Sequence, residues 1–305
     1  MARPKSLYPA LFALSLALSG AVSGAAQAQT VPAQPAPTDP APQLVPTDAK
    51  VVPEIRALGE VLQIDGVLDV MRAEGVEYGA TLRDEMFAGK GGAAWDATVA
   101  QIYDPLRMRA EFDAGLTRAL AGDAEVTAAA TTFFKSPRGQ KILELELEAR
   151  RALLDEATEA AAKEAAAQMQ AESSPRFEAL QRFAATNDLI ELNVMGALNS
   201  NLAFYKGLSR GGAFGDAMTE EDILADVWAQ EGDLRAETEE WLWPYLALAY
   251  GPLSDEELQA YADFSATPEG GRLNAAIFAA FDAIFLRISE ELGMAAARQM
   301  QGEDI

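Results

Sequence analysis

The sequence predicts an all-α protein built from two tandem, similar helical subdomains. Three observations support this prediction. Helix-forming residues dominate from about Glu54 onward, runs of β-branched residues are scarce, and helix-start signals recur at similar positions in the two halves of the chain. Half of the residues are hydrophobic, which is enough for an ordinary apolar core.

The N-terminus has the three regions of a secretory signal peptide. Basic Arg3 and Lys5 come first, an apolar run covers residues 7–22, and small residues end in an A-x-A site at Ala28. We therefore predict that residues 1–28 are removed after Ala28 and that the mature protein is periplasmic. A retained membrane anchor is the alternative, but the run is shorter than the roughly 20 apolar residues of a membrane span and contains a proline. No other segment is apolar enough to cross a bilayer.

The composition excludes several classes of function. The chain has no cysteine and no histidine, and its net charge is −23. Without cysteine there are no disulfides, and without histidine the usual catalytic triads and His-ligated zinc or haem are removed. We therefore predict no catalytic residue, no cofactor and no metal site. A surface this acidic repels nucleic acid, so we also predict no nucleic-acid partner.

The chain divides into four parts. After the signal peptide, residues 29–53 are dominated by Pro, Ala, Gln, Thr and Val, and this composition predicts a disordered linker. Helical repeat 1 is predicted at 54–172 and helical repeat 2 at 173–305, separated by a Ser-Ser-Pro sequence. After cleavage, no transmembrane segment is expected.

Hydrophobic periodicity and capping residues predict the helices. The clearest helix is near the C-terminus, where large apolar residues recur three or four apart from Leu273 to Leu292. Its charged residues mostly lie off that stripe; they are Arg272, Asp282, Arg287 and Glu290. A second helix is predicted from Pro137 to about Gln170, because alanine-rich flanks outweigh the alternating Leu-Glu pattern at 143–148. Further helix starts are predicted by the capping signals at Asp104, Thr219 and Ser254, and breaks by the glycines at 89–92 and 211–212.

The two predicted halves match each other in order at four places. Residues 65–70 resemble 187–192, residues 90–93 resemble 210–213, and residues 109–111 resemble 235–237. The fourth match is the longest, and it pairs Phe133-x-x-Ser136-Pro137-x-Gly139 with Phe264-x-x-Thr267-Pro268-x-Gly270. A repeat of this length predicts a duplicated domain, because solenoid units are only about 20–50 residues long.

The fourth match is a motif with a structural interpretation. The aromatic residue would pack into the core where one helix ends, Ser-Pro or Thr-Pro would start the next helix, and glycine would allow close approach. A ligand site that offers backbone N–H groups to an anion is the alternative interpretation of this joint. The copy at Phe133 resembles the hallmark of a bacterial domain family of unknown function, number 2059. This resemblance implies an exported, all-helical protein of Gram-negative bacteria, and it implies no activity.

One aromatic segment is unusual. Residues 241–250 would form a helix that is apolar on nearly every side, so it is either buried between the halves or a hydrophobic groove for a peptide, lipid or partner helix. The candidate surface residues are Trp241, Trp243, Tyr245 and Tyr250. We therefore expect a non-enzymatic periplasmic binding protein with an unknown protein or peptide partner. The alternatives are a carboxylate-dependent hydrolase of envelope glycans, using acids such as those at 220–222 or 237–240, and a purely structural envelope component.

Overall fold

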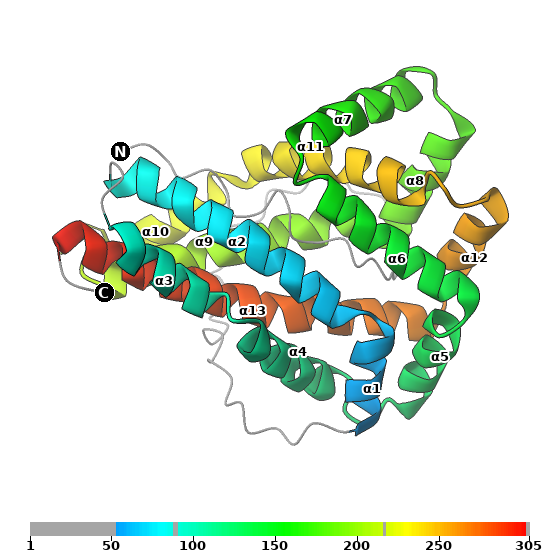
Figure 1. Cartoon of the computed structure of the whole chain (residues 1–305), viewed down its shortest axis with the longest axis horizontal. Coiled ribbons are helices and arrows are strands. Elements are labelled where there is room, and N and C mark those ends of the chain that lie inside the picture. The colour runs from blue at the N-terminus through cyan, green and yellow to red at the C-terminus, as the bar shows by residue number, and fades with distance from the viewer. Residues whose placement is uncertain (1–52, 88–90, 216–217, 303–305) are drawn as a thin grey trace, which may run out of the picture.

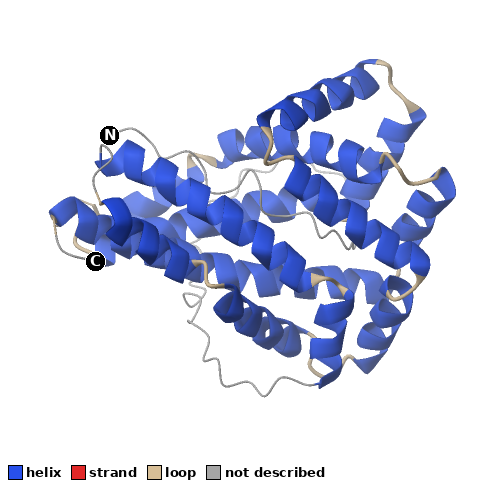
Figure 2. Cartoon of the chain, in the orientation of Figure 1, coloured by secondary structure: helices blue, strands red, loops and turns tan. Residues whose placement is uncertain are grey.

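The computed structural model describes residues 53–87, 91–215 and 218–302, and in these ranges every regular element is an α-helix. Short loops join the helices (Figure 2). The all-α prediction is therefore confirmed. The predicted signal peptide at 1–28 lies outside the described residues, as does the predicted linker at 29–53 except for Pro53, which begins the first helix.

The helices follow one another along the chain with few intervening residues. In the predicted first half they are α1 (Pro53–Val61), α2 (Ile64–Phe87), α3 (Gly92–Ile102), α4 (Pro105–Ala119), α5 (Ala124–Phe134), α6 (Pro137–Ala152) and α7 (Glu156–Ala171). In the predicted second half they are α8 (Pro175–Thr186), α9 (Leu189–Arg210), α10 (Glu220–Trp228), α11 (Glu231–Tyr250), α12 (Asp255–Ser265) and α13 (Pro268–Gln301).

Two helices of the second half organise the packing. The longest, α13, extends along the molecule, packs lengthwise on α9 and also contacts α3, α4 and α5 (Figure 1). Helix α11 packs on α9 of its own half and on α6 and α7 of the first half. The core therefore mixes side chains from both predicted halves. No described helix, α13 included, combines the length and the apolar character needed to cross a membrane.

Local capping signals placed most of the helix starts correctly. A side-chain cap followed by proline begins α4, α6 and α13, and a reciprocal capping box begins both α10 and α12. These interactions satisfy backbone N–H groups that have no partner within the helix. Because each of them spans only three residues, the sequence was sufficient to predict them.

The helix predicted from Pro137 to about Gln170 was wrong. The structure divides it into α6 and α7, with a turn at residues 153–155. The Asp155 carboxylate accepts a hydrogen bond from the Thr158 backbone N–H at 2.9 Å and so starts a new helix. The break changes the chain direction and lets α7 pack on α11.

The C-terminal helix is buried on more sides than its sequence predicted. Arg287, predicted to lie off the apolar stripe, is only 6% exposed. Its Nε donates to Glu111 at 2.7 Å and its Nη1 to the backbone oxygen of Ile102 at 2.9 Å. Burial also raises the pKa of Asp282 to about 7. The buried face of α13 is wider than the predicted apolar stripe because α9 and α4 both pack on this helix.

The junctions α1–α2 and α8–α9 have the same geometry. Each passes through a non-glycine residue with positive φ, Gln63 at 56° and Asp188 at 48°. Beyond each junction, an arginine from a later helix binds an acid near the start of the long helix: Arg109 pairs with Asp65 and Arg235 with Glu191. These paired features are 125 to 126 residues apart, whereas the predicted match of 65–70 with 187–192 has an offset of 122 residues.

Candidate functional site

The two copies of the proline motif form matching helix joints. Between α5 and α6, the Ser136 hydroxyl accepts from the Gly139 N–H at 3.0 Å and donates to the Phe133 carbonyl at 2.6 Å. Between α12 and α13, Thr267 makes the same two bonds, at 3.0 Å with the Gly270 N–H and 2.7 Å with the Phe264 carbonyl. Pro137 and Pro268 each take the first helical position, where no N–H is required.

The glycine in each joint is required for close approach of the backbone. A Cβ atom at Gly139 would lie 2.3 Å from the Phe133 carbonyl oxygen, and one at Gly270 would lie 2.2 Å from that of Phe264. Both distances are below any normal contact. In each joint the hydroxyl group and the glycine N–H form a hydrogen bond with each other. The geometry is therefore that of a closely packed connection between two helices.

The two joints meet in space. The rings of Phe133 and Phe264 stack with centroids 4.2 Å apart and an interplanar angle of 9°. The ring of Phe134 packs edge-on against both Phe264 and Tyr261. The motif therefore joins consecutive helices and also holds the two predicted halves together. These contacts were not visible from the sequence, because the paired residues are 127 to 131 positions apart and no local pattern links them.

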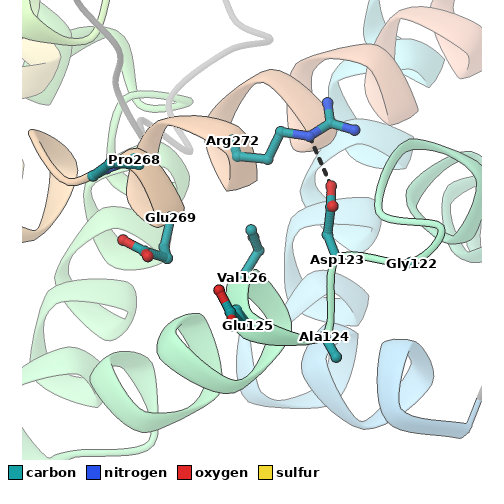
Figure 3. A pocket seen from close by; sticks show the side chains of 8 residues that line it. All are labelled: Gly122, Asp123, Ala124, Glu125, Val126, Pro268, Glu269 and Arg272. Atoms are coloured by element: carbon teal, nitrogen blue, oxygen red, sulfur yellow. Dashed lines mark hydrogen bonds and ion pairs between the residues drawn. The ribbon is translucent and has the colours of Figure 1, made fainter.

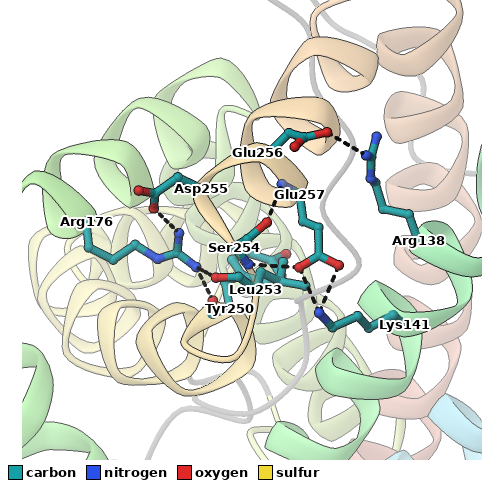
Figure 4. A network of polar contacts seen from close by, with 9 residues as sticks. All are labelled: Arg138, Lys141, Arg176, Tyr250, Leu253, Ser254, Asp255, Glu256 and Glu257. Atoms are coloured by element: carbon teal, nitrogen blue, oxygen red, sulfur yellow. Dashed lines mark hydrogen bonds and ion pairs between the residues drawn. The ribbon is translucent and has the colours of Figure 1, made fainter.

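Ion pairs extend this contact on both sides. Lys141 of α6 binds Glu257, which also caps the start of α12, with Nζ–Oε distances of 2.7 and 2.8 Å (Figure 4). On the other side, Arg272 of α13 donates from Nε to Asp123 at the start of α5, at 2.8 Å. Each cation stands four residues after the joint proline and reaches the helix start of the opposite half.

A surface pocket of about 500 Å³ lies beside the Arg272–Asp123 pair (Figure 3). Its lining residues come from the starts of α5 and α13 and are Gly122, Asp123, Ala124, Glu125, Val126, Pro268, Glu269 and Arg272. The only cation among them, Arg272, is already engaged by the Asp123 carboxylate and by the Ala119 carbonyl. Among the described residues, no group of three or more carboxylates could hold a metal ion. This pocket therefore offers no charge suited to an anion and no set of metal ligands.

The aromatic segment of α11 is divided between core and edge. Tyr245 and Tyr250 are fully buried, so these two predicted surface residues do not form a groove. They turn inward because α6 and α8 cover that side of α11. Trp241 and Trp243 are only partly buried, Trp241 stacking on Tyr245 with centroids 4.9 Å apart.

A buried carboxyl group lies against these tyrosines. Glu146 of α6 is 3% exposed, and its Oε1 accepts from the hydroxyls of Tyr250 at 2.6 Å and Tyr261 at 3.1 Å. The Tyr245 hydroxyl donates to the backbone oxygen of Glu146 at 3.4 Å, whereas Glu146 Oε2 has no hydrogen-bond partner. Burial raises the pKa of Glu146 to about 8, even though both tyrosine hydrogen bonds lower it. The carboxyl group is therefore largely protonated near neutral pH.

Sequence reasoning missed Glu146, although a signal was present. Its position follows Ile142 and Leu143 by four and three residues, which places it on the apolar side of a helix. One turn later on the same side, Arg150 forms a buried ion pair with Glu74 of α2, with Nη2–Oε2 at 2.7 Å. An acid at a core position of an amphipathic helix was therefore the available indication of this polar cluster.

The acids considered for catalysis lie elsewhere. Asp222 belongs to the capping box of α10, where hydrogen bonds from Thr219 hold its pKa below the usual value. Glu237 has a raised pKa because of partial burial and the nearby charges of Asp233 and Glu240. The described pocket contains neither of them and does not contain Glu146. These candidate acids therefore do not form a pair that faces across a cleft.

Trp243→Ala should destabilise the protein. The Trp243 ring packs on Phe177 of α8 with centroids 5.4 Å apart, so its removal leaves a gap at the α8–α11 contact. We expect a loss of about 1–3 kcal/mol in the free energy of unfolding, measured by urea denaturation. An unchanged midpoint would mean that the ring does not contribute to packing and is available as a surface.

Helix α10 carries exposed apolar side chains that sequence reasoning did not select. Ile223 and Val227 are buried, whereas Leu224 is 44% and Trp228 is 53% exposed. The available signal was the spacing: Leu224 and Trp228 are four residues apart and each follows a residue of the buried stripe.

Comparison with known proteins gives one match. Residues 107–168 match the model of a family described as "Uncharacterized protein conserved in bacteria (DUF2059)". No curated protein and no solved structure matches the chain. The matched segment contains the joint between α5 and α6 and the buried Glu146. The resemblance predicted from the motif at Phe133 is thereby confirmed, and residues 107–168 carry the features of this uncharacterized bacterial family.

Proposed function

We propose that this chain is a non-enzymatic binding protein of the bacterial envelope, exported to the periplasm by a signal peptide that is cleaved after Ala28. The observation that carries the binding role is the exposed pair Leu224 and Trp228 on α10. Large exposed apolar side chains next to each other are typical of interaction sites. Bacterial origin of the matched family is consistent with this compartment.

We further propose that the folded part consists of two similar subdomains, 54–172 and 173–305. Several matching features support this division: the paired joints, the paired left-handed junctions and the paired arginine–acid contacts. The packing is reciprocal, because α6 of the first half lies on α11 of the second, and α13 of the second lies on α4 of the first. A duplicated ancestor would produce such an exchange.

The alternative function, a carboxylate-dependent hydrolase, gains less support. Glycoside hydrolysis needs two carboxyl groups that flank a substrate, one of them with a raised pKa. Glu146 has the raised pKa, but its carboxyl group is enclosed by Tyr250 and Tyr261 inside the core. A substrate could reach it only if α6 separated from α11 and α12. Surface recognition requires no such opening.

Site-specific crosslinking in intact bacteria tests the proposed function. A photo-reactive amino acid at position 224 should give discrete adducts with other envelope proteins. The same group at position 106, which is 81% exposed on α4, is the matched control and should give none. Identical adduct patterns at both positions, or no adduct at 224, would contradict a binding role for α10. The mature N-terminus of the recovered protein is expected at Gln29.

A further inference from the structure

The apolar pair on α10 forms one exposed ridge. Side chains four residues apart lie on the same side of a helix, so Leu224 and Trp228 are neighbours on consecutive turns. The inward residues Ile223 and Val227 already attach α10 to the body of the protein. Leu224 and Trp228 are about half exposed, so much of the ridge remains accessible to another molecule.

The charges around this ridge have one sign. Between Arg210 and Arg235 the sequence has seven acidic residues and no Lys or Arg. Within the part of the chain that the structure describes, Glu220, Glu221 and Asp226 are exposed and take part in no ion pair. The next cation along the chain, Arg235, is held by Glu191 and Glu231. Glu220 and Glu221 stand four and three residues before Leu224, so they lie on its side of α10, whereas Asp226, two residues from both Leu224 and Trp228, lies on the other side.

We infer that α10 is the docking surface for a cationic amphipathic segment of a partner protein. Leu224 and Trp228 would contact its apolar residues, and Glu220 and Glu221 would pair with its Lys or Arg side chains. A cation that crosses the face of the Trp228 indole adds further attraction. This inference rests on the proposed binding function and adds the chemistry of the partner.

Charge complementarity selects this occupant over the others. An anionic lipid surface would meet like charge at α10, and so would a second copy of this chain, whose net charge is −23. A neutral apolar segment would leave the free carboxylates without partners. The ridge is small, so binding should be weak. Binding should also be sensitive to salt, because the Debye length falls from about 10 Å at 0.1 M salt to about 3 Å at 1 M.

Titration of the full mature chain with a synthetic peptide tests the inference. The probe is a helical peptide of leucine and lysine with leucines at i, i+3, i+4 and i+7, and binding is measured by calorimetry. We expect one saturable site at low salt. Trp228→Ala and, independently, Leu224→Ala should each weaken binding by about tenfold. Leu106→Ala, which removes an exposed leucine on α4, should leave the affinity unchanged.

Acid variants separate the site from general attraction to an acidic protein. The double variant Glu220→Gln, Glu221→Gln should weaken binding and reduce its dependence on salt, whereas Glu164→Gln on α7 should not. The inference is overturned if the peptide does not bind, if Trp228→Ala binds as tightly as wild type, or if both control variants lose as much affinity. Crosslinking at position 224 to a segment without basic residues would also overturn it, and would leave the proposed function intact.

Discussion

Glu146→Gln should remove much of the loss of stability that the wild-type protein undergoes as the pH rises from about 5 to about 8. The folded-state pKa of Glu146 is raised from 4.5 to about 8, chiefly by burial. Between these two values the folded protein binds a proton that the unfolded chain has released. The contribution of Glu146 to stability is therefore greatest below the unfolded pKa, falls as pH rises and levels off above the folded pKa.

The expected size of this effect follows from linkage. A raised carboxyl pKa removes about 1.4 kcal/mol of unfolding free energy per pH unit over the window, so the total loss is roughly 3–5 kcal/mol. Glutamine stays neutral, and its carbonyl can still accept hydrogen bonds from Tyr250 and Tyr261. Urea denaturation at intervals from pH 4 to 9 should give wild-type and variant curves that diverge steadily between pH 5 and 8.

Two variants serve as controls for this result. Glu148→Gln changes an exposed acid on the same helix and should reproduce the wild-type profile. Asp282→Asn removes a second carboxyl group, whose pKa is raised to about 7. The difference between its stability curve and the wild-type curve should therefore stop growing near pH 7. Parallel curves for Glu146→Gln and wild type would show that the Glu146 carboxyl group is not held in its neutral form.

Gly139→Ala and Gly270→Ala should each lower the unfolding free energy by about 3 kcal/mol. The added Cβ would lie 2.2–2.3 Å from a backbone carbonyl oxygen of the preceding helix, and a backbone atom cannot yield as a flexible side chain can. The helix angle at the joint would have to change, and the stacked rings of Phe133 and Phe264 would separate. Thermal and urea unfolding measure the loss.

Gly232→Ala is the matched control. Its Cβ would find no atom within 4 Å, and it lies in the first turn of α11. Alanine favours helix, so this variant should gain up to about 1 kcal/mol. If all three alanine variants behaved alike, close approach at the joints would not be the reason for glycine there.

The sequence predicted those features whose cause lies within a few residues. The starts of α4, α6, α10, α12 and α13 were correct, because a cap, a proline or a capping box acts over three positions. The break before α7 was missed even though Asp155 and Thr158 supply a cap, since the alanine-rich sequence on both sides favours helix equally well. Local signals of comparable strength cannot be ranked without knowing what the helix packs on.

The candidate site was less predictable. Of the two alternatives for the aromatic segment at 241–250, burial applies to Tyr245 and Tyr250, which are core residues, and the exposed tryptophan is Trp228 on another helix. Periodicity cannot choose the buried side of a helix that is apolar all round. That choice was made by α6 and α8, which cover one side of α11.

By itself, therefore, the sequence determined an all-α chain, its main helix starts and its lack of cysteine and histidine chemistry. Tertiary structure alone decided that Phe133 stacks on Phe264, that Glu146 is buried among tyrosines and that Leu224 and Trp228 face outward. The physical reason is range. Capping and helix propensity act between near neighbours, whereas burial depends on which distant helix covers a surface.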